Sequence, residues 1–315
     1  MTVFVTGATG VIGSVLVRVL SEQGIRVRAL VRQSGGLPSD VEGVAGDLDD
    51  AGALRRGLVG ADGVVHLAAQ LHLNDPSPAL ADQYRRVNTE GTERLARLAA
   101  EAGIGRFVFA STINVYGPSA GREAWTEADA PRPETIYAKT KLAAEESVLA
   151  LAEGVVLRLA AVYGPGMKGN YPELARVLRR GVRILPGDGR NRRTLVHVED
   201  AARALALAAM GKVPPGLYNL TGGVQTFDAI VRGIQAAVGV RPGVRYVPAR
   251  LARWGAVVPE VLARAVGQRL PARLLIDKLT EDVAVSGDAL RAASPYRPRY
   301  DDLAEGWAAG PPSTP

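Results

Sequence analysis

The residues with the clearest chemistry are Tyr137 and Lys141, which lie four positions apart in a segment with a helical pattern. Residues at i and i+4 share one face of a helix, so the ammonium is expected beside the phenol. A free phenol has a pKa of about 10, whereas acid–base chemistry at neutral pH needs a value of about 7. A nearby ammonium and an oxidised nicotinamide both favour the phenolate. The pair predicts proton transfer at a substrate oxygen; an exposed tyrosine beside a solvated lysine is the alternative for an isolated match.

Two hydroxyls, those of Ser111 and Thr112, directly follow the apolar run 107–110. This run is typical of a buried strand, and an α/β protein binds its ligand at the carboxyl ends of such strands. A hydroxyl there can share the proton of the reacting oxygen with Tyr137 and fix its orientation. Capping of the strand end is the alternative.

A glycine-rich turn follows the first apolar run and opens a helix that ends near Gly24. Gly7 permits a tight turn, Gly10 allows the backbone to approach a pyrophosphate, and Gly13 permits close packing of helix on strand. The amides at the start of the helix then face the diphosphate with a partial positive charge. This context favours dinucleotide binding over an ordinary strand–helix turn.

Two further positions concern the adenosine half of a dinucleotide. Asp47, followed by Leu48, ends the third strand candidate and can accept from the adenine amino group; a helix N-cap is the alternative. The second strand ends in Val31 and Arg32, where an NAD site has a carboxylate for the ribose 2′-OH. Arg32, with Ser34, can instead meet a 2′-phosphate, which favours NADP over NAD. The alternative is that Arg32 is solvated and that the site does not distinguish NAD from NADP.

The elements that must position these residues alternate in type through the first half of the chain. Strands are expected at 2–6, 25–31, 41–45, 63–68, 106–111 and 155–160, with helical patterns at 11–22, 82–102 and 134–152. Such alternation predicts right-handed βαβ units in an α/β, Rossmann-like, doubly wound parallel sheet. Two later runs, 194–198 and 216–220, are expected to add strands or contacts to the same domain.

We therefore expect two units. Residues 1–165 with 192–222 would form the dinucleotide-binding domain, and residues 166–191 with 223–315 a smaller C-terminal substrate-binding lobe over the ends of the sheet. A ligand cleft between the two follows from that arrangement.

Composition excludes several function classes. The chain has 315 residues, 47% of them hydrophobic, and no cysteine, so disulfides, thiolate metal sites and thiol nucleophiles are excluded. The histidines at 66, 72 and 197 have no metal-ligand spacing, so no metal is expected. Although the net charge is +6, the arginines are scattered, which does not favour nucleic acid. Without a long apolar run or a leader-like N-terminus, no membrane association and a cytoplasmic location are expected.

Together these motifs resemble the extended short-chain dehydrogenases/reductases, of the nucleotide-sugar epimerase, dehydratase and reductase kind. The resemblance covers nearly the whole chain. The matching stretches, in order, are 6–13, 47–48, 66–69, 88–92, 111–112 before 115–117, 137–141, 157–158, 163–166 and 197–200.

The resemblance implies a role for each matching residue. Tyr137 would be the general acid/base, and Lys141 would lower its pKa and hold the nicotinamide ribose. Thr112 falls on the catalytic Ser/Thr position, with Ser111 beside it. Other contacts implied are those of Gly7, Gly10, Ile12 and Gly13 with the pyrophosphate, Asp47 and Leu48 with adenine, Ala68 and Ala69 with the cofactor, and Asn88 with the neighbouring helix and sheet. His66 is expected to be structural.

Two stretches and three departures bear on the substrate. By the resemblance, Asn170 and Arg193, in 166–170 and 190–194, would reach a nucleotide diphosphate; a solvated basic turn is the alternative. Ile113 and Asn114 stand where 4,6-dehydratases have an Asp–Glu pair, which disfavours dehydration. Ala161, and Val31 at the second strand, depart from many 4-epimerases.

The function expected is hydride transfer at a hydroxyl or keto carbon, C4, of a nucleotide-diphosphate sugar, by an epimerase or a 4-keto reductase acting as a homodimer. A reductase of non-sugar ketones, dihydroflavonol-like or hydroxysteroid-like, is the second hypothesis. A non-catalytic dinucleotide sensor is the third, and the intact Tyr137–Lys141 pair disfavours it.

Overall fold

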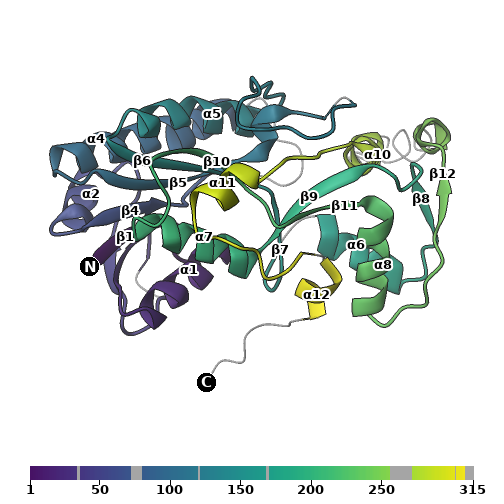
Figure 1. The fold of residues 1–315 in the computed structure, drawn as a ribbon, viewed down its shortest axis with the longest axis horizontal. Helices are drawn as coiled ribbons and strands as arrows, with labels where there is room; N and C mark the ends of the chain where they lie inside the picture. The colour runs from purple at the N-terminus through teal and green to yellow at the C-terminus, as the bar shows by residue number, and fades with distance from the viewer. Residues whose placement is uncertain are drawn as a thin grey trace.

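A seven-stranded parallel sheet lies at the centre of one half of the molecule (Figure 1). The computed structural model describes residues 1–33, 36–71, 80–119, 121–167, 170–255, 272–301 and 303–308. The strands follow the order β10-β6-β5-β4-β1-β2-β3. Their bounds are β1 Thr2–Thr6, β2 Arg26–Val31, β3 Glu42–Ala45, β4 Gly63–His66, β5 Arg106–Thr112, β6 Glu153–Leu159 and β10 Gly216–Leu220.

Helices cover both faces of this sheet, which explains why its strands are almost uninterruptedly apolar. Val3, Phe4 and Val5 of β1 have no exposed surface. Helices α1 (Val11–Glu22) and α7 (Val198–Ala209) pack on one face, and α2 (Ala51–Leu58), α4 (Gly91–Glu101) and α5 (Ile136–Leu149) on the other (Figure 1). The α/β class and the parallel Rossmann-like sheet predicted from the sequence are confirmed, with each predicted strand placed within two residues.

Helix α2 has no counterpart among the expected elements. It has only eight residues, and two of them, Gly52 and Gly57, disfavour a helix. The structure shows why a glycine stands at 57: a Cβ there would lie 2.3 Å from the Phe4 ring. The packing of α2 on β1 therefore overrides the local propensity.

The expected helix 82–102 is composite. It begins as α3 (Ala81–Tyr84), continues as the π-helical turn η2 (Arg85–Glu90), and ends as α4. π-helical turns are rare and often mark functional sites. Here the turn contains Asn88, whose contacts are described below.

Smaller sheets and helices make up the other half of the molecule. β7 (Ala161–Tyr163), β9 (Arg192–His197) and β11 (Gly223–Thr226) form one sheet, and β8 (Ile184–Pro186) pairs with β12 (Arg245–Val247). Their core is shared with α6 (Asn170–Arg179), α8 (Phe227–Ala237), α10 (Ala272–Thr280) and α12 (Leu303–Ala308). Of the two later runs, 216–220 joins the large sheet as β10, whereas 194–198 falls mostly in β9 of the small one. The two-unit division of the chain stays a prediction.

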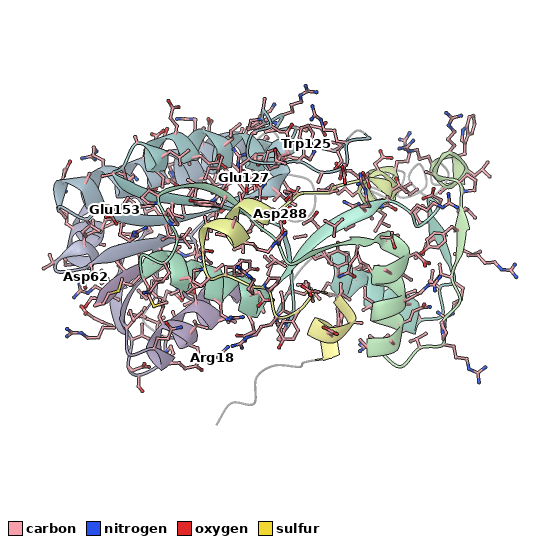
Figure 2. The ribbon with its side chains drawn as sticks, viewed as in Figure 1. Arg18, Asp62, Trp125, Glu127, Glu153 and Asp288 are labelled. Atoms are coloured by element: carbon pink, nitrogen blue, oxygen red, sulfur yellow. The ribbon has the colours of Figure 1, made fainter. Side chains whose placement is uncertain are left out.

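A chain segment before α11 (Asp288–Ala293) joins the two halves. Trp125 pairs through its backbone with Val285, and Arg193 with Val283. Nearby, the Glu127 carboxylate accepts the backbone N–H of Asn219 in β10, at 2.6 Å; Figure 2 labels Trp125 and Glu127 in this region. Residues 282–285 are thus held between β9 and the loop that follows β5.

Among the residues that the structure describes, no helix is long and apolar enough to cross a membrane. The same residues contain no group of three acidic, histidine or cysteine side chains placed to hold a metal ion.

Candidate functional site

The glycine turn between β1 and α1 has the geometry of a phosphate cradle. Gly7 has a φ of +74°, and a Cβ there would lie 2.7 Å from the backbone nitrogen of Ala68. At Gly13 a Cβ would lie 2.1 Å from the Gly7 carbonyl oxygen. Gly10 occupies the N-cap of α1 and offers no side-chain acceptor to the first-turn amides. Ile12 is half-buried in that same turn. These residues fit a dinucleotide pyrophosphate.

The loop after β4 lies directly against this cradle. The Thr6 hydroxyl accepts the backbone N–H of Ala68 at 3.2 Å, and Ala69 follows as an exposed residue. The same Thr6 hydroxyl is bonded to His66 Nδ1 at 2.6 Å, while His66 Nε2 meets the Thr92 hydroxyl at 2.9 Å. His66 is fully buried and both of its ring nitrogens have partners. It is structural, as expected.

Asn88 connects the same loop to helix α5, which bears Tyr137 and Lys141. Its side-chain oxygen accepts the backbone N–H of Gln70 at 2.7 Å, and its amide group donates to the Gln70 carbonyl and to the Thr140 hydroxyl, both at 3.1 Å. Thr140 immediately precedes Lys141 on α5. A continuous set of contacts therefore runs from the glycine turn through Ala68 and Asn88 to α5.

Tyr137 and Lys141 lie one turn apart on α5, whose N-cap is Thr135. Lys141 is 1% exposed, and its ammonium lies 3.8 Å from the centroid of the Phe109 ring of β5. Burial lowers the pKa of Lys141 to about 7, although Glu145 acts in the opposite direction. The buried lysine is thus held against the sheet and is not a solvated surface cation.

The Tyr137 phenol is in a different electrostatic state from the one expected. Burial raises its pKa to about 12, and the neighbouring Tyr84 adds to this increase. The sequence predicts a lowered pKa from Lys141, but the chain alone provides no such effect. A positive charge bound beside the phenol would favour the phenolate and lower this pKa.

The two hydroxyls at the end of β5 point to different partners. Ser111 donates to the Glu145 carboxylate, which also holds the Arg158 guanidinium at 2.6 Å. Glu145 and Arg158 are both 4% exposed. The Ser111 hydroxyl is therefore engaged in a buried ion pair, and its predicted contact with substrate has no support in this geometry. Thr112 caps the turn η3 (Ile113–Tyr116) through the N–H of Asn114 at 3.2 Å, as the capping alternative predicts.

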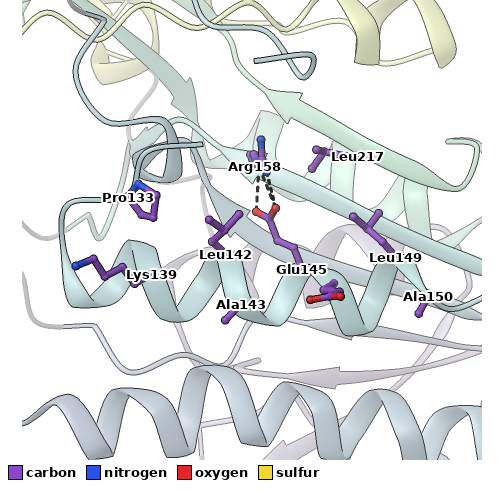
Figure 3. A pocket seen from close by; sticks show the side chains of 10 residues that line it. Pro133, Lys139, Leu142, Ala143, Glu145, Leu149, Ala150, Arg158 and Leu217 are labelled. Carbon is purple, nitrogen blue, oxygen red and sulfur yellow. Dashed lines mark hydrogen bonds and ion pairs between the residues drawn. The ribbon is translucent and has the colours of Figure 1, made fainter. Parts of the chain in front are cut away.

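A surface groove of about 760 Å³ adjoins that ion pair on the outer side of α5 (Figure 3). Its lining residues are Pro133, Lys139, Leu142, Ala143, Glu145, Glu146, Leu149, Ala150, Arg158 and Leu217. Tyr137, Lys141 and Thr112 do not line it. The groove is thus separate from the candidate active site.

At the adenosine end, Asp47 and Leu48 have distinct local roles. Asp47 is exposed, and its Oδ1 accepts the N–H groups of Asp49 and Asp50, at 2.9 and 3.2 Å. The N-cap of α2 is Asp50, so the alternative that Asp47 caps a helix is wrong. Leu48 is buried in the core below α4.

Arg32 follows β2 directly and is exposed. Ser34, its predicted companion, lies outside the described residues, as does His72. Arg32 is therefore the only described member of the proposed 2′-phosphate contact.

Arg193, which the resemblance predicts to bind substrate, projects from β9 and is 15% exposed. Its guanidinium lies 3.7 Å from the Glu281 carboxylate, and it is close enough to Tyr171 of α6 to oppose the rise in the pKa of that phenol that burial causes. Asn170 opens α6, but its side chain is outside the described part of the chain. No local sequence pattern points to Glu281, because 88 residues separate it from Arg193 along the chain.

Residues 197–200 connect the start of α7 to the C-terminal segment. His197 caps α7 and lies between the rings of Tyr163 and Tyr300, with centroids 5.2 and 4.1 Å away. Asp200 is fully buried and accepts the backbone N–H groups of Arg299 and Tyr300. These contacts attach the C-terminal segment to α7.

Residues 3–221 match the model of the NAD dependent epimerase/dehydratase family. The chain belongs to this family. The match includes the cradle, Thr112, Tyr137, Lys141 and Arg193.

Known family members differ in the reactions that their names describe. UDP-glucose 4-epimerase of Vibrio cholerae is 35% identical over 213 residues, which cover 63% of each protein. The 3-diazoavenalumate denitrifying reductase of a Streptomyces species is 30% identical over 97% of this chain and 99% of its own length. Among solved structures, MoeE5 in complex with UDP-glucose and NAD has a TM-score of 0.75 and 30% identity, covering 98% of this chain and 96% of its own. The chain thus spans less than two thirds of that epimerase.

Proposed function

We propose that this chain is an NAD(P)-dependent epimerase or 4-keto reductase that transfers a hydride at C4 of a nucleotide-diphosphate sugar. The observation that carries the proposal is the set of contacts joining the glycine cradle, through Ala68 and Asn88, to the helix that bears Tyr137 and Lys141. These contacts support a pyrophosphate site and an acid–base pair at the same edge of the sheet. A cytoplasmic homodimer is part of the proposal.

The residues that would hold the dinucleotide are those of the cradle and of the neighbouring strand ends. They are Gly7, Gly10, Ile12, Gly13, Arg32, Asp47, Leu48, Ala68, Ala69, Tyr137 and Lys141. When bound, the dinucleotide supplies the hydride acceptor or donor. Relatives such as MoeE5 bind NAD; for this chain, Arg32 and the lack of a carboxylate at the end of β2 favour NADP.

Residues of the chain itself would transfer the proton. In the oxidising direction, Tyr137 takes the proton of the substrate hydroxyl, and in the reducing direction it returns one to the carbonyl oxygen. Thr112 orients that oxygen by a hydrogen bond. Lys141, one turn along α5 from Tyr137, would hold the nicotinamide ribose beside the phenol.

Arg193 and Asn170 would anchor the sugar nucleotide. A guanidinium suits a diphosphate because it donates two parallel hydrogen bonds. The complex of MoeE5 with UDP-glucose supports this substrate class.

The test is a panel of UDP-, dTDP- and GDP-sugars with and without NADPH, with products followed by mass and chromatographic position. For the active substrate, Arg193→Ala is expected to raise KM about tenfold, the cost of one charge-assisted contact, and to leave cofactor affinity unchanged. Arg190→Ala removes an exposed guanidinium three residues away and serves as the control. If Arg193→Ala has the same KM for the sugar nucleotide as the wild type, Arg193 does not anchor the substrate.

A second candidate function is the reduction of an uncharged, non-sugar ketone. Glu281 already compensates the charge of Arg193, and a full-length relative is named as a reductase of a compound that is not a nucleotide sugar. Activity confined to uncharged ketones, with no effect of Arg193→Ala, would support this function instead.

A further inference from the structure

Two consecutive arginines of β9 have very different partners. The Arg192 guanidinium pairs with Asp282 at 2.6 Å and also donates to the backbone carbonyls of Arg122 and Glu123. Arg193 has a looser ionic partner, Glu281, at 3.7 Å, yet its side chain is the more buried of the two, 15% exposed against 31%. The contacts of Arg192 hold the backbone in place, whereas the looser contact of Arg193 with Glu281 can be exchanged for another anion.

Backbone contacts fix the position of Glu281 independently of Arg193. The residue directly follows α10, and its N–H donates to the Asp277 carbonyl at 2.9 Å. Two residues further, the Val283 N–H donates to the Arg192 carbonyl at 2.8 Å, and the Val283 carbonyl accepts from the Thr194 hydroxyl at 3.1 Å. The carboxylate is therefore presented to Arg193 by the fold and does not depend on a flexible attachment.

Charged groups from three directions face this carboxylate. The pKa of Glu281 is raised, mainly by its burial and further by the nearby carboxylate of Glu134, although Arg193 of β9 and Lys278 of α10 act in the opposite direction. Glu134 stands three residues before Tyr137. Glu281 therefore lies between the candidate substrate anchor and the start of the catalytic helix.

We propose that Glu281 is a specificity-determining residue, an internal counter-ion that neutralises Arg193 until the diphosphate of the substrate displaces it. The inference rests on the proposed nucleotide-sugar function. An uncharged ligand leaves the Arg193–Glu281 ion pair intact and gains no binding free energy from Arg193. A monoanion exchanges one negative charge for another, whereas a diphosphate offers two charges and bidentate acceptors. The pair thus discriminates by charge against weaker anions.

Proton uptake follows from the same exchange. A displaced Glu281 remains near Glu134 and the incoming diphosphate, and negative neighbours favour the protonated carboxyl. Diphosphate binding is therefore expected to take up a proton and to be tighter at lower pH.

The experiment measures binding of UDP to the full chain by calorimetry, in buffers of different ionisation enthalpy. Glu281→Gln removes the competing charge and keeps the side-chain shape, so the UDP dissociation constant is expected to fall about fivefold, the upper range for a partly exposed ion pair. The wild type should take up more protons on binding than Glu281→Gln does, because the terminal phosphate of UDP contributes equally to both. In turnover assays KM falls and kcat stays within about twofold.

Asp282→Asn is the matched control, because it alters the adjacent pair. It is expected to lower the melting temperature and to change UDP affinity less than Glu281→Gln does, because Arg192 holds that carboxylate at 2.6 Å and Arg193 acts on it only at longer range. Thermal melts confirm that Glu281→Gln is folded.

Arg193→Ala, measured in parallel, separates the two possible failures. If it weakens UDP binding and Glu281→Gln does not strengthen it, the counter-ion role is wrong and the nucleotide-sugar proposal stands. If UDP binds none of the three proteins, both proposals fail. Binding to Glu281→Gln but not to the wild type would support the counter-ion role.

Discussion

The Lys141 ammonium lies 3.8 Å from the centroid of the Phe109 ring, so the lysine of the acid–base pair is buried against β5. The ring face partly compensates the charge. Burial nevertheless brings the pKa of Lys141 to about 7, far below its value of about 10.5 in the unfolded chain.

Stability should therefore depend on pH through Lys141. Between about pH 7 and 10.5 the unfolded state binds more protons at this residue than the folded state, so the free energy of unfolding rises with pH. Lys141→Met removes this contribution. Urea unfolding at pH 7, 8 and 9 is expected to show a slope with pH that is smaller in the variant than in the wild type; equal slopes would contradict the buried, depressed lysine.

The same variant tests function. Lys141→Met is expected to lower kcat at least about 100-fold, the scale of acid–base catalysis, and also to weaken cofactor binding. Thr112→Val should cost less than either Lys141→Met or Tyr137→Phe, because the phenol still reaches the reacting oxygen. Turnover numbers and cofactor dissociation constants check both statements.

Tyr137 is expected to change its pKa when oxidised cofactor binds. The chain alone holds it at about 12, since burial disfavours the phenolate, and a positive nicotinamide would lower it. The measurement is tyrosinate absorbance between pH 7 and 10, with and without NAD⁺ or NADP⁺, taken as the difference between wild type and Tyr137→Phe. That variant should retain cofactor binding and lose nearly all turnover. A difference spectrum that oxidised cofactor leaves unchanged would show that the phenol is not activated in this way.

His66 should make the protein sensitive to acid. Burial, with Lys141 as a second cause, lowers its pKa to about 3, against about 6.5 in the unfolded chain. Between pH 6.5 and 3 the unfolded state takes up the proton first, so stability falls as the pH falls, by up to about 1.4 kcal/mol per pH unit. His66→Asn is expected to be less stable at pH 7 but to have a shallower dependence below pH 6.5. Parallel stability curves for the two proteins would refute the assignment.

Cofactor choice is tested at Arg32. Wild type is expected to bind NADPH more tightly than NADH, because a guanidinium suits a 2′-phosphate and no carboxylate repels it. Arg32→Asp should reverse the order. Fluorescence titration of both reduced cofactors decides the matter; a wild type purified with tightly held NAD would contradict the preference and favour the epimerase.

Much of the fold, and the position of Tyr137 and Lys141 one turn apart on a helix, could be predicted because their signals are local. The glycine spacing, the apolar strands and the i, i+4 relation of Tyr137 and Lys141 need only a few neighbouring residues. The sequence predicts that both Ser111 and Thr112 face the substrate. Adjacent residues of a strand point to opposite faces of the sheet, so only one of the two hydroxyls can do so. The contact of Glu281 with Arg193 could not be predicted at all, because it arises only from tertiary structure.

Strand β10 completes the large sheet from residues 216–220, beside β6 at residues 153–159. During synthesis, β6 leaves the ribosome about 60 residues before the strand that covers it. Six of the seven residues of β6 are buried in the folded protein. Until β10 is made, β6 is therefore an apolar edge strand with unpaired backbone groups, and such strands readily pair with another chain. A fragment ending at residue 165 would keep that edge permanently. Attempts to isolate the cofactor-binding half should retain the chain through residue 220, however dispensable the intervening substrate-side segments are to the chemistry.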